Sequence, residues 1–183
     1  MPRLLILVAI AALAACTTYG SVGLESRKIA SLYSVSPQIQ WNRYTDGDLE
    51  VWTVDGPLLD SLQFTSALGD GDSLYEIEGQ EQMPRFRGNM SESEVMEFVV
   101  DSFAAAGAQK VEPTGLAPAS FGQRPGFRFD LAYQSGDGLD KLGSVLGTLN
   151  DGKLYLIIYT GAAQYYYPKY KQAVEALFAS IKI

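Results

Sequence analysis

Residues 153–160 are the segment that most limits how this 183-residue chain folds. The core of the segment, Leu154 to Tyr159, is apolar at every position, so an extended strand here has two apolar faces. Such a strand needs cover on both sides and therefore belongs in the centre of a sheet. Asp151 and Gly152 directly before it predict a tight turn from a preceding strand.

Further strands are expected on both sides of this central one. Residues 39–54 predict a β-hairpin, because apolar and polar residues alternate on either side of a turn at 46–48. Phe127, Phe129 and Leu131 share one side of another expected strand. The same pattern predicts further strands over the ranges 61–67, 74–77, 110–121, 126–134 and 140–149.

Two helices complete the predicted order of elements. Ser91 followed by Glu94 forms a capping box, which predicts a helix over 92–106 with Gly107 as its left-handed cap. A second helix is expected over 168–180, with Pro168 in its first position. The order strands, helix, strands, helix indicates an α+β domain from 38 to 183, an antiparallel β-sheet covered by helices.

The N-terminal segment has the order of residues found in secretory signals. Arg3 is followed by an apolar run to Leu13 and by two small residues, Ala14 and Ala15. The run is too short for a spanning helix, which needs roughly 20 apolar residues. With Cys16, the sequence Leu13, Ala14, Ala15 resembles the lipobox of bacterial lipoproteins.

The lipobox resemblance implies a lipid anchor. Residues 1–15 would be the signal peptide, with Leu13, Ala14 and Ala15 recognised by the signal peptidase. Cys16 would carry diacylglycerol and a further acyl chain such as palmitate, and 16–37 would be the lipidated N-terminus and tether. Thr17 in place of aspartate favours the periplasmic face of the outer membrane in the family's sorting rule. The alternative is an ordinary secretory signal and a chance cysteine.

Charge and cysteine content restrict the remaining classes. The chain has 14 basic and 21 acidic residues, and its net charge of −7 becomes about −8 once Arg3 is removed with the signal. An acidic surface argues against binding to nucleic acid or anionic lipid. Because Cys16 is the only cysteine, no internal disulfide is available and the core must hold the fold.

The C-terminal sequence YYPKY at 166–170, leading into ALFASI at 176–181, resembles the Mog1/PsbP-like superfamily, as does the order of elements. That resemblance implies an α/β/α sandwich. It also implies non-enzymatic binding, since members include a photosystem accessory subunit, a binder of a small GTPase and bacterial lipoproteins. It assigns no functional residue in this chain.

The absence of histidine removes the usual nucleophilic triads and histidine zinc sites. Asp70, Asp72 and Glu81 have part of the spacing of a calcium loop. However, Leu74 and Tyr75 occupy positions that need an oxygen ligand and a glycine, so a solvated turn is the favoured interpretation. No metal, no cofactor and no catalytic residue is therefore predicted.

Other acidic pairs have the same interpretation. Asp46 with Asp48, and Asp137 with Asp140, fit turns because aspartate accepts local hydrogen bonds. A hydrolase built from such carboxylates stays the least favoured alternative, since their spacing selects no pair.

Two segments are candidates for a binding surface. Tyr165 and Tyr166 precede the last helix, where Tyr167 and Tyr170 are expected to pack on the sheet. The second segment spans 79–88 and is otherwise expected to be a loop that covers the sheet; its candidate contact residues are Met83, Arg85 and Phe86.

Three functions remain open. The favoured one is an outer-membrane lipoprotein that binds another envelope protein as an accessory factor. The second is a carrier of a small molecule or lipid, with a cavity lined by Trp41, Trp52, Phe129 and Tyr159. The third is the carboxylate hydrolase, with Asp70, Asp72, Asp137 or Asp140 as its acids.

Overall fold

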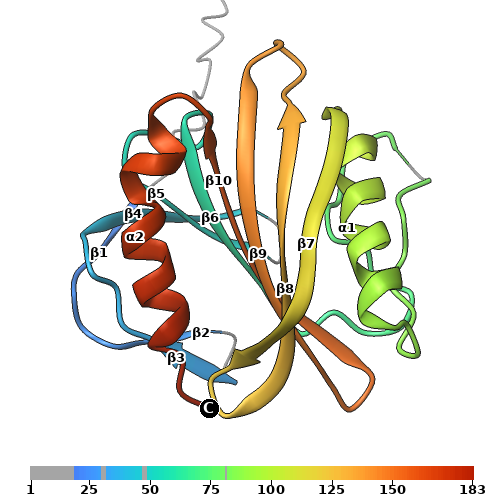
Figure 1. Ribbon diagram of the computed structural model, residues 1–183, viewed down its shortest axis with the longest axis horizontal. Coiled ribbons are helices and arrows are strands. Elements are labelled where there is room, and N and C mark those ends of the chain that lie inside the picture. The colour runs from blue at the N-terminus through green and yellow to red at the C-terminus, as the bar shows by residue number, and fades with distance from the viewer. Residues whose placement is uncertain (1–18, 30–31, 47–48, 81) are drawn as a thin grey trace, which may run out of the picture.

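The computed structural model in Figure 1 describes residues 19–29, 32–46, 49–80 and 82–183. In this part of the chain an eight-stranded antiparallel sheet and two helices form an α+β domain, as the sequence predicts. Leu13 to Cys16 lie outside the described residues. The sheet has the spatial order β1 (Gly20–Val22), β4 (Trp41–Asp46), β5 (Leu49–Thr53), β6 (Asp60–Thr65), β10 (Lys153–Ala162), β9 (Asp140–Asn150), β8 (Arg124–Gln134) and β7 (Gln109–Phe121).

Strand β10 is central, as its two apolar faces predict. It lies between β6 and β9 and pairs with both in antiparallel register. Its side chains alternate between two separate hydrophobic clusters, one on each face of the sheet. Tyr155, Ile157 and Tyr159 belong to one cluster, and Leu154, Leu156 and Ile158 to the other.

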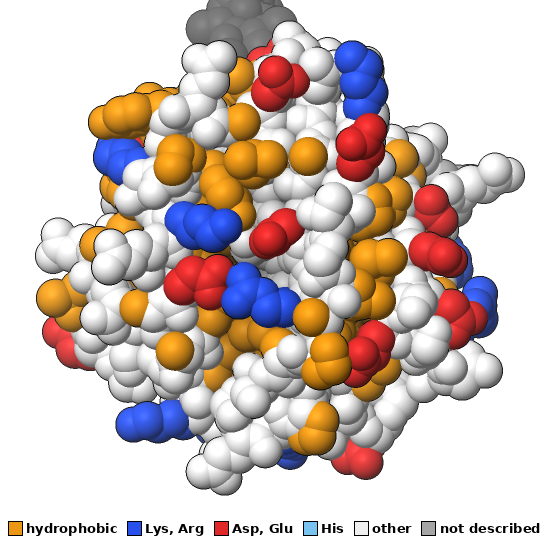
Figure 2. All heavy atoms as spheres, viewed as in Figure 1, with side chains coloured by type: hydrophobic (Ala, Val, Ile, Leu, Met, Phe, Trp, Pro, Cys, Tyr) orange, Lys and Arg blue, Asp and Glu red, His pale blue; other side chains and the backbone are white. Residues whose placement is uncertain are grey.

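The helices cover opposite faces of the sheet (Figure 1). Helix α2 (Tyr166–Ala179) packs on the face of Tyr159, and α1 (Glu92–Ala105) packs on the other. Figure 2 shows acidic and basic side chains next to one another in the middle of the α2 face. Arg128 of β8 donates two hydrogen bonds to the Glu175 carboxylate of α2, at 2.8 and 3.2 Å. This bidentate pair joins α2 to β8 at a partly exposed position.

The residues at the start of each helix suit a helix N-terminus. The predicted capping box of α1 is present: the Ser91 hydroxyl accepts from the Glu94 amide at 3.3 Å, and the Glu94 carboxylate accepts from the Ser91 amide at 2.8 Å. Gly107 follows with φ +94°, as predicted. Helix α2 begins two residues before the predicted start, so Pro168 is its third residue, where the missing N–H has no helical partner to lose. Neither helix has the length and apolar character needed to cross a membrane.

The domain begins earlier than residue 38, which corrects the predicted tether over 16–37. Strand β1 pairs with β4, and β2 (Arg27–Ile29) pairs with β3 (Tyr33–Val35) in a separate two-stranded sheet. Their apolar side chains are buried in the α2-side cluster and complete it. Three-residue strands are too short to show an alternating pattern, so the sequence suggested only a polar tether.

The strand predicted over 74–77 is also wrong. This segment belongs to a long connection between β6 and α1 that packs over the α1 face of the sheet. Near this segment the connection bonds to itself, from the Gly71 amide to the Phe86 carbonyl and from the Phe86 amide to the Asp72 carbonyl. Leu74 is buried, which explains why its apolar neighbourhood resembled a strand.

We predict that Ser91→Ala lowers the free energy of unfolding by about 1 kcal/mol, because the first turn of α1 loses its side-chain acceptor. Urea denaturation followed by tryptophan fluorescence measures the change. Ser93→Ala, an exposed position in the same helix turn, is the matched control and should stay within about 0.5 kcal/mol of the parent. Equal losses in the two variants would contradict a specific capping role for Ser91.

Candidate functional site

The start of α2 is held close to the end of β10. The Tyr159 hydroxyl lies 2.9 Å from the Tyr166 carbonyl oxygen and 3.2 Å from that of Tyr167, and it donates to this pair. Gly161 permits the approach, because a Cβ atom there would lie 2.8 Å from the Tyr167 amide nitrogen. The first turn of α2 therefore lies directly on the sheet.

The loop between β5 and β6 is organised around one buried carboxylate. Asp60 is fully buried, and its two oxygens accept from the amides of Val54, at 2.8 Å, and Asp55, at 2.7 Å. Burial raises the pKa of Asp60, although these two backbone hydrogen bonds oppose the rise. The Thr53 hydroxyl accepts from the Gly56 amide at 2.9 Å, which closes the turn. The loop thus holds Asp55 in a defined position.

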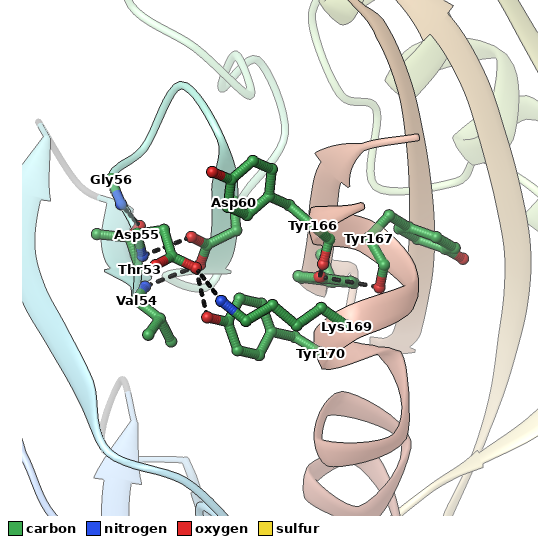
Figure 3. Close-up of polar contacts among 10 residues, drawn as sticks. Thr53, Val54, Asp55, Gly56, Asp60, Tyr166, Tyr167, Lys169 and Tyr170 are labelled. Carbon is green, nitrogen blue, oxygen red and sulfur yellow. Dashed lines mark hydrogen bonds and ion pairs between the residues drawn. The ribbon is translucent and has the colours of Figure 1, made fainter. Parts of the chain in front are cut away.

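Asp55 joins this loop to α2 (Figure 3). Its carboxylate accepts from the Lys169 ammonium at 2.9 Å and from the Tyr170 hydroxyl. The hydrogen bonds from Tyr170 and Lys169 lower the pKa of Asp55, and the hydrogen bonds to Tyr170 and Asp55 raise the pKa of Lys169. Both groups are therefore charged at neutral pH, and neither is suited to exchange protons there.

Three tyrosine rings surround the same ammonium group. The Lys169 nitrogen lies 4.7 Å from the ring centre of Tyr170, 5.3 Å from that of Tyr165 and 5.6 Å from that of Tyr166. Distances below about 6 Å allow cation–π attraction. We call Asp55, Tyr165, Tyr166 and Tyr170 the cation cage.

Exposed apolar side chains lie next to the cation cage. Leu58 of the β5–β6 loop is 78% exposed and Tyr165 is 59% exposed. The segment after β10 contacts two other connections here. The Ala162 amide donates to the Leu59 carbonyl in the β5–β6 loop, and the Ala163 amide donates to the Asp140 carbonyl after the β8–β9 turn. Leu139 in the β8–β9 turn is also exposed.

We call Leu58, Leu139, Tyr165, Tyr166 and Lys169 the helix-end surface. Figure 2 shows hydrophobic side chains over the start of α2.

The two segments predicted as binding surfaces are far apart. Tyr165 and Tyr166 lie beyond the end of β10, whereas the last residue of the second segment, Gly88, lies near the start of β10, beside the Gly152 carbonyl. Ten strand residues separate these places by about 30 Å. Arg85 is exposed and donates to the Gly71 carbonyl.

Met83 and Phe86 are not surface residues, which corrects their prediction as contacts. Met83 is 8% exposed and Phe86 is fully buried. Phe86 belongs to the α1-side cluster and packs against Phe98 of α1 at a ring distance of 6.2 Å. The burial of these two side chains fits the alternative interpretation of the segment, a loop that covers the sheet.

The predicted carrier cavity is also not formed by the proposed residues. Trp41, Trp52 and Tyr159 lie in the α2-side cluster, whereas Phe129 lies in the α1-side cluster, on the other face of the sheet. All four are buried in packed cores. An open groove of about 520 Å³ lies elsewhere, between Leu49 of β5 and the connection before α1.

The acidic residues of the hydrolase alternative lie in turns or, for Asp140, at the start of β9, and each accepts a hydrogen bond. Asp70 accepts from the Gly88 amide, Asp72 from the Gly69 amide and Asp137 from the Ser135 hydroxyl. Asp140 accepts from the Gln134 side chain. Within the described ranges, no group of three or more acidic, cysteine or histidine residues is placed to hold a metal ion.

The residues that organise the site were not singled out from the sequence. Asp55 has no recognisable motif, because its partners Lys169 and Tyr170 lie 114 and 115 residues later in the chain. Asp60 and Gly161 have nearby partners, in Val54 and Asp55 and in Tyr167, but no turn or helix motif marks either residue. Lys169 did carry a local signal: tyrosines three and four residues before it share its helix face. That spacing alone could have indicated a cation–π cluster.

Comparison with known proteins bears on the fold. The sequence matches no protein family and no curated protein. Among solved structures, it is similar to the solution structure of cyanobacterial PsbP (CyanoP) from Synechocystis sp. PCC 6803. The TM-score is 0.51 at 13% sequence identity, and the match covers 96% of this chain and 98% of that one. The fold is therefore PsbP-like, as the sequence resemblance implied.

We predict that Gly161→Ala destabilises the protein by about 1–3 kcal/mol, because the new methyl group meets the Tyr167 backbone and not a flexible side chain. Urea denaturation measures the loss. Gly136→Ala is the matched control, since the nearest atom to a Cβ there lies 3.7 Å away. A Gly161→Ala variant as stable as the control would show that α2 is not closely seated on β10.

We predict that Asp55→Asn changes the pH dependence of stability at acid pH. A carboxyl with a lowered pKa in the folded state stabilises the fold above its ordinary pKa, and this contribution disappears as the pH falls through the folded value. The parent should therefore be more stable than the variant at pH 6, and the difference should shrink towards pH 2. Urea midpoints across this range test it, and a constant difference would contradict it.

Proposed function

We propose that the protein is a lipid-anchored, non-enzymatic factor that binds another protein of the bacterial envelope through the helix-end surface. The observation that carries this proposal is the cluster of exposed Leu58 and Tyr165 beside a rigid, charged Asp55–Lys169 pair. Tyrosine and exposed aliphatic side chains next to fixed charges are typical of protein contact surfaces.

The chemistry of the site favours binding over catalysis. Asp55 and Lys169 hold their charges at neutral pH, and the buried Asp60 uses both oxygens for backbone amides. The PsbP-like fold also supports a non-enzymatic role, since the superfamily resembled by the sequence includes accessory subunits. These observations support a contact surface whose charged side chains are positioned by the fold before a partner binds.

The N-terminal sequence supports the anchor. Leu13, Ala14, Ala15 and Cys16 have the lipobox pattern, and two or more acyl chains hold a protein durably on a membrane. The outer membrane is the expected location, because Thr17 follows the cysteine. The anchor would keep the domain at the membrane, where an envelope partner is met.

A photocrosslinking residue in place of Tyr165 tests the contact surface in cells. We expect it to capture one envelope protein, which mass spectrometry identifies. A crosslinker in place of Glu97, exposed on the opposite helix α1, is the matched control and should not capture that protein. Cys16→Ser should abolish acyl labelling and reduce the capture, since the domain leaves the membrane.

Equal capture from the two positions, or none from either, would contradict the proposed contact surface. Acyl labelling that persists in Cys16→Ser would contradict the anchor. A small molecule that stays bound to the protein in native mass spectrometry, without any crosslinked protein, would favour the carrier alternative and direct attention to the groove beside Leu49.

A further inference from the structure

From the geometry of the cation cage, we infer that Asp55, Tyr165, Tyr166 and Tyr170 form a binding site for a lysine or arginine side chain of the partner protein, and that Lys169 fills this site in the free protein. This inference rests on the proposed function, because it names the chemistry by which the helix-end surface recognises its partner.

The position of Lys169 shows that the cage stabilises a cation. Lys169 is the fourth residue of α2, in the first turn, where the helix dipole disfavours positive charge. The first turn contains no acidic residue to offset this effect. The ammonium is instead held by the Asp55 carboxylate, from another part of the chain, and by three aromatic rings. The cage therefore provides enough attraction to overcome an unfavourable location.

Two walls of the cage, Asp55 and Tyr170, are held by the surrounding structure, whereas the Lys169 side chain can leave. Asp55 is set by the loop built on Asp60, and the Tyr170 ring is buried against Trp41 at a ring distance of 6.0 Å. The Lys169 side chain is 35% exposed and has a flexible four-carbon stem, so it reaches water without any backbone change. An incoming cation can thus replace it.

Several observations favour a basic side chain as the incoming group. The Asp55 carboxylate already accepts from an ammonium N–H, and a lysine or arginine N–H of a partner can donate the same hydrogen bond. The exposed Leu58 and Tyr165 can contact the alkyl stem of a lysine or arginine. The net charge of −7 attracts a basic partner over a longer distance.

The test uses butylammonium chloride as a mimic of a lysine side chain, titrated into the purified protein at constant ionic strength. Ring-proton NMR shifts of Tyr165, Tyr166 and Tyr170 report binding. Removal of the internal competitor in Lys169→Ala should raise the affinity about tenfold. Lys171→Ala is the matched control, since this lysine lies over Tyr167, outside the cage, and its removal should leave the affinity unchanged.

Two further measurements make the outcome decisive. Adding Asp55→Asn to Lys169→Ala should remove most of the gained affinity. In the unmodified protein, the ε-methylene protons of Lys169 should lose their ring-current shift as butylammonium saturates the cage. The inference is overturned if Lys169→Ala binds no better than the parent, if Lys171→Ala gives the same gain, or if tetramethylammonium binds and butylammonium does not.

Failure of this inference differs from failure of the proposed function. If a crosslinker in place of Leu58, which lies outside the cage, captures an envelope protein and Asp55→Asn leaves the capture unchanged, the contact surface stands and the basic-side-chain contact is wrong. If butylammonium binds as described but no protein is captured, the cage has the inferred chemistry and the proposed protein-binding role fails.

Discussion

The pairing of β6 with β10 is the constraint on which the rest of the structure depends. In the described sheet, β1, β4, β5 and β6 form one half, and β7 to β10 form the other. The two halves meet through five residue pairs, from Phe64 with Ile157 to Asp60 with Gly161. Thr65 reinforces this junction, because its hydroxyl accepts from the Leu156 amide at 2.8 Å. The apolar faces of β10 then give each helix a surface to cover.

The same pairing builds the candidate site. Asp60 stands opposite Gly161, so the loop before β6 and the helix after β10 leave the sheet at one end. This places Asp55 beside Tyr170, 115 residues later in the chain. The cation cage is therefore made from both halves of the sheet. Its geometry depends on the pairing of β6 with β10, which joins them.

Local signals in the sequence predicted β10 and α1 well, because a two-faced apolar run and a capping box need no distant partner. They failed for β1 to β3, whose short strands gain stability only from the core that they complete, and for Phe86, whose burial depends on α1 packing. For the same reason, the sequence predicted only part of the candidate site. Tyr165 and Tyr166 were found by composition, whereas Asp55 becomes relevant only when β6 pairs with β10.

Asp60 at the start of β6 and Asp55 in the loop before it have opposite pKa shifts. Asp60 is enclosed, and its raised pKa reflects burial, yet its oxygens are occupied by the amides that shape the loop. Asp55 is partly exposed, and its lowered pKa reflects donors that face a negative charge. A general acid or base would need both an intermediate pKa and an accessible oxygen in the same group. Here the two properties are divided between two residues, so one carboxylate shapes the loop and the other attracts a cation.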